Sequence, residues 1–151
     1  MDDEFFYKAI RRALDAVAAA GEDPERLEEP LRTVVIVHSA QGLIGNGGLQ
    51  YFFECDFPGR PPYSVFVDAF ERIGAQDAAS RLKAAVDLFP FSDPHLDVTS
   101  RQEFLDACAN AAPESSASQL EALSDLMCVD VSVWDRLREY VYKHSLYFGA
   151  A

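Results

Sequence analysis

The apolar positions of this chain recur every three or four residues in most segments, which is the spacing of one face of an α-helix. The clearest stripe follows Pro61 and Pro62 and closes at Gly74, a residue type that often ends helices because it tolerates a left-handed backbone. Its members are Tyr63, Phe66, Val67, Phe70 and Ile73. A second stripe, which stops at Pro90, consists of Ala79, Leu82, Val86 and Phe89. The pattern therefore predicts two consecutive amphipathic helices in the middle of the chain.

Stripes of the same kind predict a helix at each end of the chain. Asp2 and Asp3 are good residues for the start of a first helix, and Gly21 is a good residue for its end. The buried face of that helix is expected to contain Phe6, Ile10, Ala13 and Val17. The last helix is expected to bury Trp134, Leu137 and Val141. Each helix has one apolar face, as helices that pack on a core do.

Two more helix starts are predicted from capping boxes, in which a serine side chain and a glutamate three residues later cap each other's backbone N–H groups. The pairs are Ser100 with Glu103 and Ser118 with Glu121. The stretch 91–98 before the first pair is predicted to be a loop.

The segment 31–45, LRTVVIVHSAQGLIG, is open to two interpretations. Its β-branched residues favour a strand, whereas Leu31, Val35, His38 and Gly42 have helical spacing. We interpret it as a buried helix because nothing else in the chain has the pattern of a partner strand.

The next stretch, NGGLQYFFECD, predicts a joint between two helices. Glycine suits the left-handed exit of a helix and asparagine suits the start of one, so Asn46, Gly47 and Gly48 form a structural joint. We expect Gly47 to take the left-handed conformation, so that valine at this position costs at least about 1 kcal/mol of stability. We also expect the helix after the joint to turn Leu49, Phe52 and Phe53 inward.

These elements together predict an all-α fold in which residues 1–151 form a single domain of seven or eight helices. An apolar fraction of 49% is that of a folding sequence. The acidic start, MDDEFFYKAIRR, lacks the pattern of a signal peptide, and no apolar run approaches the length of a membrane span. Cys55, Cys108 and Cys128 have neither disulfide-framework nor zinc spacing, which favours a reducing cytoplasm.

Candidate catalytic chemistry is sparse. His38, His95 and His144 are scattered along the chain, and no pair has metal-ligand spacing on one helix. Cys55 lies between Glu54 and Asp56, which disfavour its thiolate and make it a poor nucleophile. We therefore expect no catalytic residue, metal or cofactor.

Charge gives the strongest indication of function. The net charge is −12, so the chain repels nucleic acid and anionic membranes and attracts basic protein surfaces. Between Arg101 and Arg136 there is no base, and this stretch predicts an acidic binding face made of Glu103, Asp106, Glu114, Glu121, Asp125, Asp130 and Asp135. The pairs at three- and four-residue spacing share a helix face, where like charges repel. An ordinary solubility surface intersperses lysines, although acids also suit the first turns of helices.

The chain has a family resemblance that rests on three stretches. They are NGGLQYFFECD, the following YSVFVDAFERIGAQDAASRLKAAVDLFP and the closing VWDRLREYVYKHS. Over residues 30–147 it resembles the bacterial domain of unknown function 4375. The resemblance implies an all-α fold. The best-described member of that family is a DNA mimic, whose surface carboxylates take the place of phosphates and occupy a DNA-binding regulator. The resemblance therefore also implies a protein partner that normally binds DNA.

The leading hypothesis is thus a non-enzymatic acidic interaction domain that mimics DNA toward a basic protein. Two alternatives stay open: an acidic helical domain that binds its partner through an apolar groove, and an enzyme of unrecognised type. A deep pocket that gathers His38, Cys55 or the tyrosines Tyr51 and Tyr63 would favour the enzyme. We expect Glu121, Asp125 and Asp130 to face solvent, so that their reversal to lysine leaves the fold intact.

Overall fold

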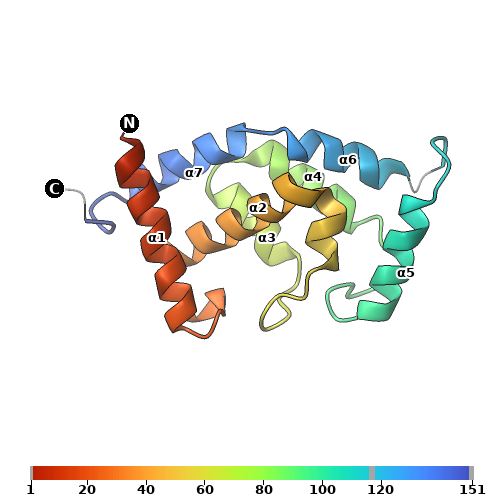
Figure 1. Cartoon of the computed structure of the whole chain (residues 1–151), viewed down its shortest axis with the longest axis horizontal. Helices are drawn as coiled ribbons and strands as arrows, with labels where there is room; N and C mark the ends of the chain where they lie inside the picture. The colour runs from red at the N-terminus through yellow and green to blue at the C-terminus, as the bar shows by residue number, and fades with distance from the viewer. Residues whose placement is uncertain (1, 116–117, 150–151) are drawn as a thin grey trace.

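The computed structural model describes residues 2–115 and 118–149, and within these ranges it contains α-helices, one short 3-10 helix and no strand. The elements are α1 (Asp3–Ala19), η1 (Pro24–Arg26), α2 (Leu31–Glu54), α3 (Ser64–Arg72), α4 (Gln76–Val86), α5 (Val98–Ala109), α6 (Gln119–Cys128) and α7 (Ser132–Lys143). Figure 1 shows α2 through the middle of the molecule, α1 across one end and α5 at the other. Helices α6 and α7 follow one another along one edge. The all-α prediction is confirmed.

The ambiguous segment 31–45 is the first half of α2, so the helical interpretation is confirmed. This helix contacts α1, α3, α5, α6 and α7, and is therefore surrounded by other helices. Val34, Val35, Ile36 and Val37 are all buried although they point in different directions around the axis. A helix buried on several sides needs apolar residues all round, and this burial outweighs the modest helix preference of β-branched residues.

The joint lies inside α2, and it bends at Gly48 instead of Gly47. The backbone of Gly48 has φ 74° and ψ −174°, a region that only glycine occupies without strain. The Leu49 N–H just after the bend donates to Ser124 Oγ of α6 at 2.9 Å. Gly47 is required for a different reason, since a Cβ on it would lie 2.5 Å from the Cβ of Tyr51. The expectation of a left-handed Gly47 is therefore wrong by one residue.

Neither predicted capping box is present at its helix start. Helix α5 begins at Val98, and its N-cap is Asp97, whose carboxylate accepts a hydrogen bond from the Ser100 N–H at 3.0 Å. That hydrogen bond lowers the pKa of Asp97. Ser118 does precede α6, but its hydroxyl donates to carbonyls of the preceding loop. Aspartate caps as well as serine, so the earlier Asp97 starts α5 within the stretch predicted to be a loop.

The residues after the joint form an aromatic cluster that holds α2 against α3 and the end of α4. Phe52 and Phe53 are fully buried. Phe53 packs edge-on against Tyr63 at 5.1 Å and against Phe89 at 5.0 Å between ring centroids, while Phe52 packs against Phe66 at 5.1 Å. Such pairs add to the energy of burial, so the bend at the joint directs the large side chains of α2 into the core.

Candidate functional site

Helices α5 and α6 and the loop between them carry a group of exposed acids that we call the α5–α6 acidic surface. Glu103 and Asp106 lie on α5, Glu114 in the loop, and Glu121 and Asp125 on α6. The two helices pack against each other, and Figure 1 shows them at the same end of the molecule. Within the described ranges none of these five carboxylates forms a salt bridge. They are therefore available to a partner without first breaking an ion pair.

The one base within α5 and α6 has its charge turned inward. The guanidinium of Arg101 donates to the carbonyl oxygen of Phe53 at 2.7 Å, to that of Pro94 at 2.8 Å and to the carboxylate of Asp56 at 2.9 Å. Only 2% of Arg101 is exposed. It therefore ties α5 to the end of α2, and its positive charge does not offset the exposed carboxylates of α5. The sequence showed Arg101 only as a boundary of the acidic stretch.

Several acids at the other end of the molecule are paired, although Asp15 of α1 forms no salt bridge within the described ranges. Asp3 of α1 lies 3.1 Å from Arg138, and Glu4 lies 2.6 Å from Lys8. On α7, Glu139 lies 3.1 Å from Arg136. Uncompensated acids are consequently more prominent at the α5–α6 end than on α1 and α7.

Two of the predicted acids differ from the other five. Asp130 accepts hydrogen bonds from the Ser132 N–H and hydroxyl and lies 3.5 Å from Arg81, and only 12% of its side chain is exposed. The expectation that Asp130 faces solvent is therefore wrong, because its carboxylate caps the start of α7. Asp135 is exposed but lies 3.6 Å from Arg138. Neither is a free carboxylate in the way that Glu121 and Asp125 are.

The glycine joint positions part of the acidic surface. A hollow of about 270 Å³ lies between α2, α5 and α6, and Gly47, Cys108, Glu121 and Ser124 are among its lining residues. Ser124 accepts the hydrogen bond from the backbone after the bend. Because Ser124 lies between Glu121 and Asp125 on α6, this bond fixes how α6 presents its carboxylates.

The side chains that would favour an enzyme are spread over the molecule. His38 packs edge-on against Trp134, with ring centroids 5.7 Å apart, whereas Tyr63 belongs to the aromatic cluster. Burial, followed by the charges of Glu54 and Asp56, raises the pKa of Cys55 and keeps it a thiol. Within the described residues no three His, Cys, Asp or Glu side chains are arranged to hold a metal ion. The same part of the chain contains no helix with the length and hydropathy of a membrane span.

The pKa of His38 predicts a pH dependence of stability. Burial lowers this pKa from its ordinary value of about 6.5. The unfolded chain therefore binds a proton at a higher pH than the folded chain does. The contribution of neutral His38 is fully present above about pH 6.5 and is lost as the pH falls toward the lower, folded-state pKa.

We expect the free energy of unfolding of the wild-type chain to decrease between pH 7.5 and 5.5, and to decrease less in His38→Gln. Urea denaturation at both pH values measures the difference. An identical decrease in both proteins would show that burial of His38 does not contribute.

The helices and the exposed carboxylates define a small all-α domain whose α5–α6 acidic surface has no salt bridge within the described ranges. Residues 25–144 match the family described as DMP19-like protein, and the chain belongs to this family. The match includes the glycine joint and all five acids of the α5–α6 acidic surface. It also covers most of residues 30–147, the region of the family resemblance in the sequence. No curated protein and no solved structure matches the chain.

Proposed function

We propose that this chain is a DNA mimic, a non-enzymatic interaction domain that occupies the nucleic-acid-binding surface of a basic protein. The observation that supports this function best is the α5–α6 acidic surface, where five exposed carboxylates lie on two adjacent helices and the loop between them without salt bridges in the described ranges. Membership of the DMP19-like family is consistent with the same role.

The physical basis is the charge density of the nucleic acid that such a partner recognises. Duplex DNA presents about one negative charge per 1.7 Å of its axis, and proteins bind it mainly through lysine and arginine contacts to phosphates. On α5 and α6, Glu103/Asp106 and Glu121/Asp125 have helical spacings that hold side chains about 5–6 Å apart. Rigid helices therefore fix the backbone positions of several carboxylates, so that a basic surface has only their side-chain rotamers left to order.

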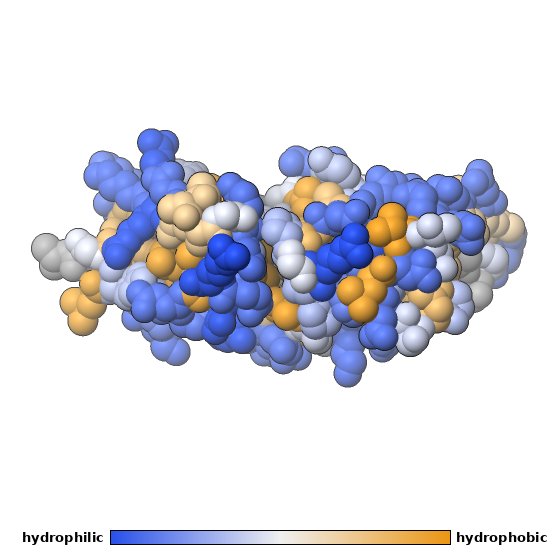
Figure 2. Space-filling model, turned by 90° about the horizontal axis from the view of Figure 1, so that it is seen from below, coloured by the Kyte–Doolittle hydropathy of each residue, from blue (hydrophilic) through white to orange (hydrophobic). Residues whose placement is uncertain are grey.

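A second candidate, binding through an apolar groove, is favoured by a separate cavity. This cavity of about 190 Å³ lies between the end of α1, η1, α2 and the start of α3, and apolar residues such as Val35, Phe57 and Phe66 line it. It is large enough for one bulky side chain of a partner. Figure 2, which views the molecule from below, shows apolar residues separated by hydrophilic ones instead of one broad apolar patch. An interface there would therefore be small, which favours the acidic surface.

Charge reversal tests the proposal. The variant Glu121→Lys/Asp125→Lys changes two exposed residues that make no salt bridge in the described ranges, so the fold is expected to survive. Affinity for the basic partner is expected to fall roughly 100-fold, because like charges placed opposite one another cost several kcal/mol. Isothermal titration calorimetry at low salt measures the change, and circular dichroism verifies the fold.

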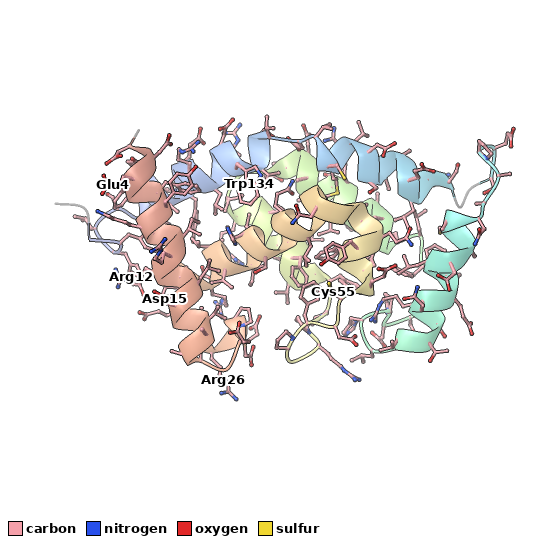
Figure 3. All side chains as sticks on the ribbon, viewed as in Figure 1. Glu4, Arg12, Asp15, Arg26, Cys55 and Trp134 are labelled. Atoms are coloured by element: carbon pink, nitrogen blue, oxygen red, sulfur yellow. The ribbon has the colours of Figure 1, made fainter. Side chains whose placement is uncertain are left out.

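The matched control is Asp15→Lys/Asp68→Lys, which changes the net charge by the same amount on α1 and α3. Figure 3 labels Asp15 on α1, at the opposite end of the molecule from α5. The control is expected to bind nearly as well as the wild type. Equal losses in both variants would mean that only net charge matters, and unchanged affinity in the α6 variant would exclude the α5–α6 acidic surface as the binding site.

A further inference from the structure

A second feature, on the edge formed by α6 and α7, has the chemistry of a binding site. A hollow of about 230 Å³ lies between the middle of α2 and the junction of α6 with α7, and its lining includes Gln41, Gly42, Gly45, Asp130, Val131 and Trp134. A Cβ added to Gly42 or to Gly45 would meet no atom within 4 Å. The α2 backbone is therefore uncovered here, and we call this space the glycine hollow.

Gln41 provides the observation that points to a ligand. It is 2% exposed, and its Nε2 donates to the carbonyl oxygen of Met127 at 3.3 Å, which fixes the orientation of the amide. Its Oε1 is buried and accepts no hydrogen bond from any described residue. A buried acceptor without a donor is costly. Because Gln41 lines the glycine hollow, an N–H donor that entered the hollow and moved the side chains covering Oε1 would satisfy it.

An aromatic ring in the lining of the hollow favours a positively charged donor. Helix α6 ends at Cys128 and α7 begins at Ser132, so the negative end of one dipole and the positive end of the other meet at the hollow and largely offset each other. The carboxylate of Asp130, which lines the same space, adds negative charge, although Arg81 lies 3.5 Å from one of its oxygens. Trp134 supplies an indole ring, the best aromatic partner for a cation. Figure 3 shows Trp134 beside the middle of α2.

We infer that the glycine hollow receives an arginine side chain of the basic partner. This inference rests on the proposed function for the nature of that partner. Arginine fits better than lysine because a planar guanidinium stacks on an indole and donates several N–H groups in fixed directions, whereas an ammonium is a strongly hydrated point charge. The hollow gives directional recognition of one side chain, while the α5–α6 acidic surface attracts the basic protein as a whole.

The test uses the intrinsic fluorescence of the protein, since Trp134 is the only tryptophan in the chain. The probe is the blocked peptide Gly-Gly-Arg-Gly-Gly, and the same peptide with neutral citrulline replacing arginine is its control. A saturable change in Trp134 emission is expected with the arginine peptide, and at least a tenfold weaker response with the citrulline peptide. Equal responses to both peptides, or no saturation with arginine, would overturn the inference.

The variant Gly45→Leu fills the hollow without harming the helix. Space is open above Gly45, and leucine favours a helix more than glycine does. The melting temperature is therefore expected to stay the same or rise while the saturable response to the arginine peptide disappears. In Gln41→Met, which keeps the size of the side chain but removes its acceptor, arginine binding is expected to weaken severalfold. A response that persists unchanged in Gly45→Leu would show that the peptide binds elsewhere.

These outcomes are distinguishable from failure of the proposed function. Gly45→Leu retains the acidic surface, and Glu121→Lys/Asp125→Lys retains the glycine hollow. If charge reversal leaves partner binding intact while the arginine peptide still binds at the hollow, the mimic proposal fails and the arginine site stands. If the peptide does not bind and charge reversal abolishes partner binding, the arginine site fails and the mimic proposal stands.

Discussion

Replacing Arg101 with methionine is expected to destabilise the protein by about 3 kcal/mol. The substitution keeps most of the apolar contacts of the side chain but removes three hydrogen-bond donors. The carbonyl oxygens of Phe53 and Pro94 would lose these partners, and a buried acceptor left unpaired costs about 1–3 kcal/mol. The lost pairing with Asp56 contributes little, because that carboxylate is 52% exposed and is screened by solvent. Urea denaturation followed by circular dichroism measures the loss.

A matched control is Arg136→Met on α7. That guanidinium pairs with Glu139 at 3.1 Å, but both side chains are about half exposed. Exposed substitutions of this kind usually change stability by less than about 0.5 kcal/mol. If Arg101→Met were as mild as Arg136→Met, Arg101 would not be the tie that holds α5 to the end of α2.

The second large effect is expected at the bend in α2. Gly48→Ala is predicted to cost about 2–3 kcal/mol, because alanine at φ 74° and ψ −174° is strained. The new methyl group would also collide with Ser124 Oγ and disturb its hydrogen bond with the Leu49 N–H. Thermal and urea unfolding measure the loss of stability.

The control for this variant is Gly45→Ala, three residues earlier in the same helix. Its Cβ enters open space, and the position lacks the positive φ of Gly48. Alanine there is expected to stabilise the protein by about 0.4–1 kcal/mol. A loss of stability in Gly48→Ala together with a gain in Gly45→Ala would verify the bend. An unchanged stability in Gly48→Ala would contradict it.

Most helices could be predicted from the sequence because they have an apolar stripe and a recognisable boundary, whereas α5 buries few side chains and starts before its predicted capping box. The stripe from Tyr63 to Ile73, for example, is buried and closes at Gly74, whose φ is 85°. The β-branched segment 31–45 forms a helix, as expected for a run to which the sequence offers no partner strand. Local pattern therefore determined the fold class.

Details that depend on three-dimensional partners were less predictable. Either glycine of the joint fits a left-handed turn, and the choice of Gly48 depends on Ser124, which is 75 residues away along the chain. Asp130 belongs to a run of acids, but Arg81 and the start of α7 enclose it. Arg101 is an isolated base in the sequence, yet it binds the carbonyl of Phe53 in the core and that of Pro94 in the loop before α5. These roles follow from packing between distant segments, which a local pattern does not contain.

The central claim is that a basic protein binds the α5–α6 acidic surface of this chain as it would bind DNA. The most direct measurement is capture of a partner from lysate of the source organism on the immobilised chain, with stepwise elution at rising salt and competition by duplex DNA. The Glu121→Lys/Asp125→Lys variant on a parallel column is the control. We predict a DNA-binding protein that moderate salt releases, that duplex DNA displaces and that the variant column does not retain. A partner that stays bound through high salt, ignores duplex DNA and binds both columns equally would contradict the account.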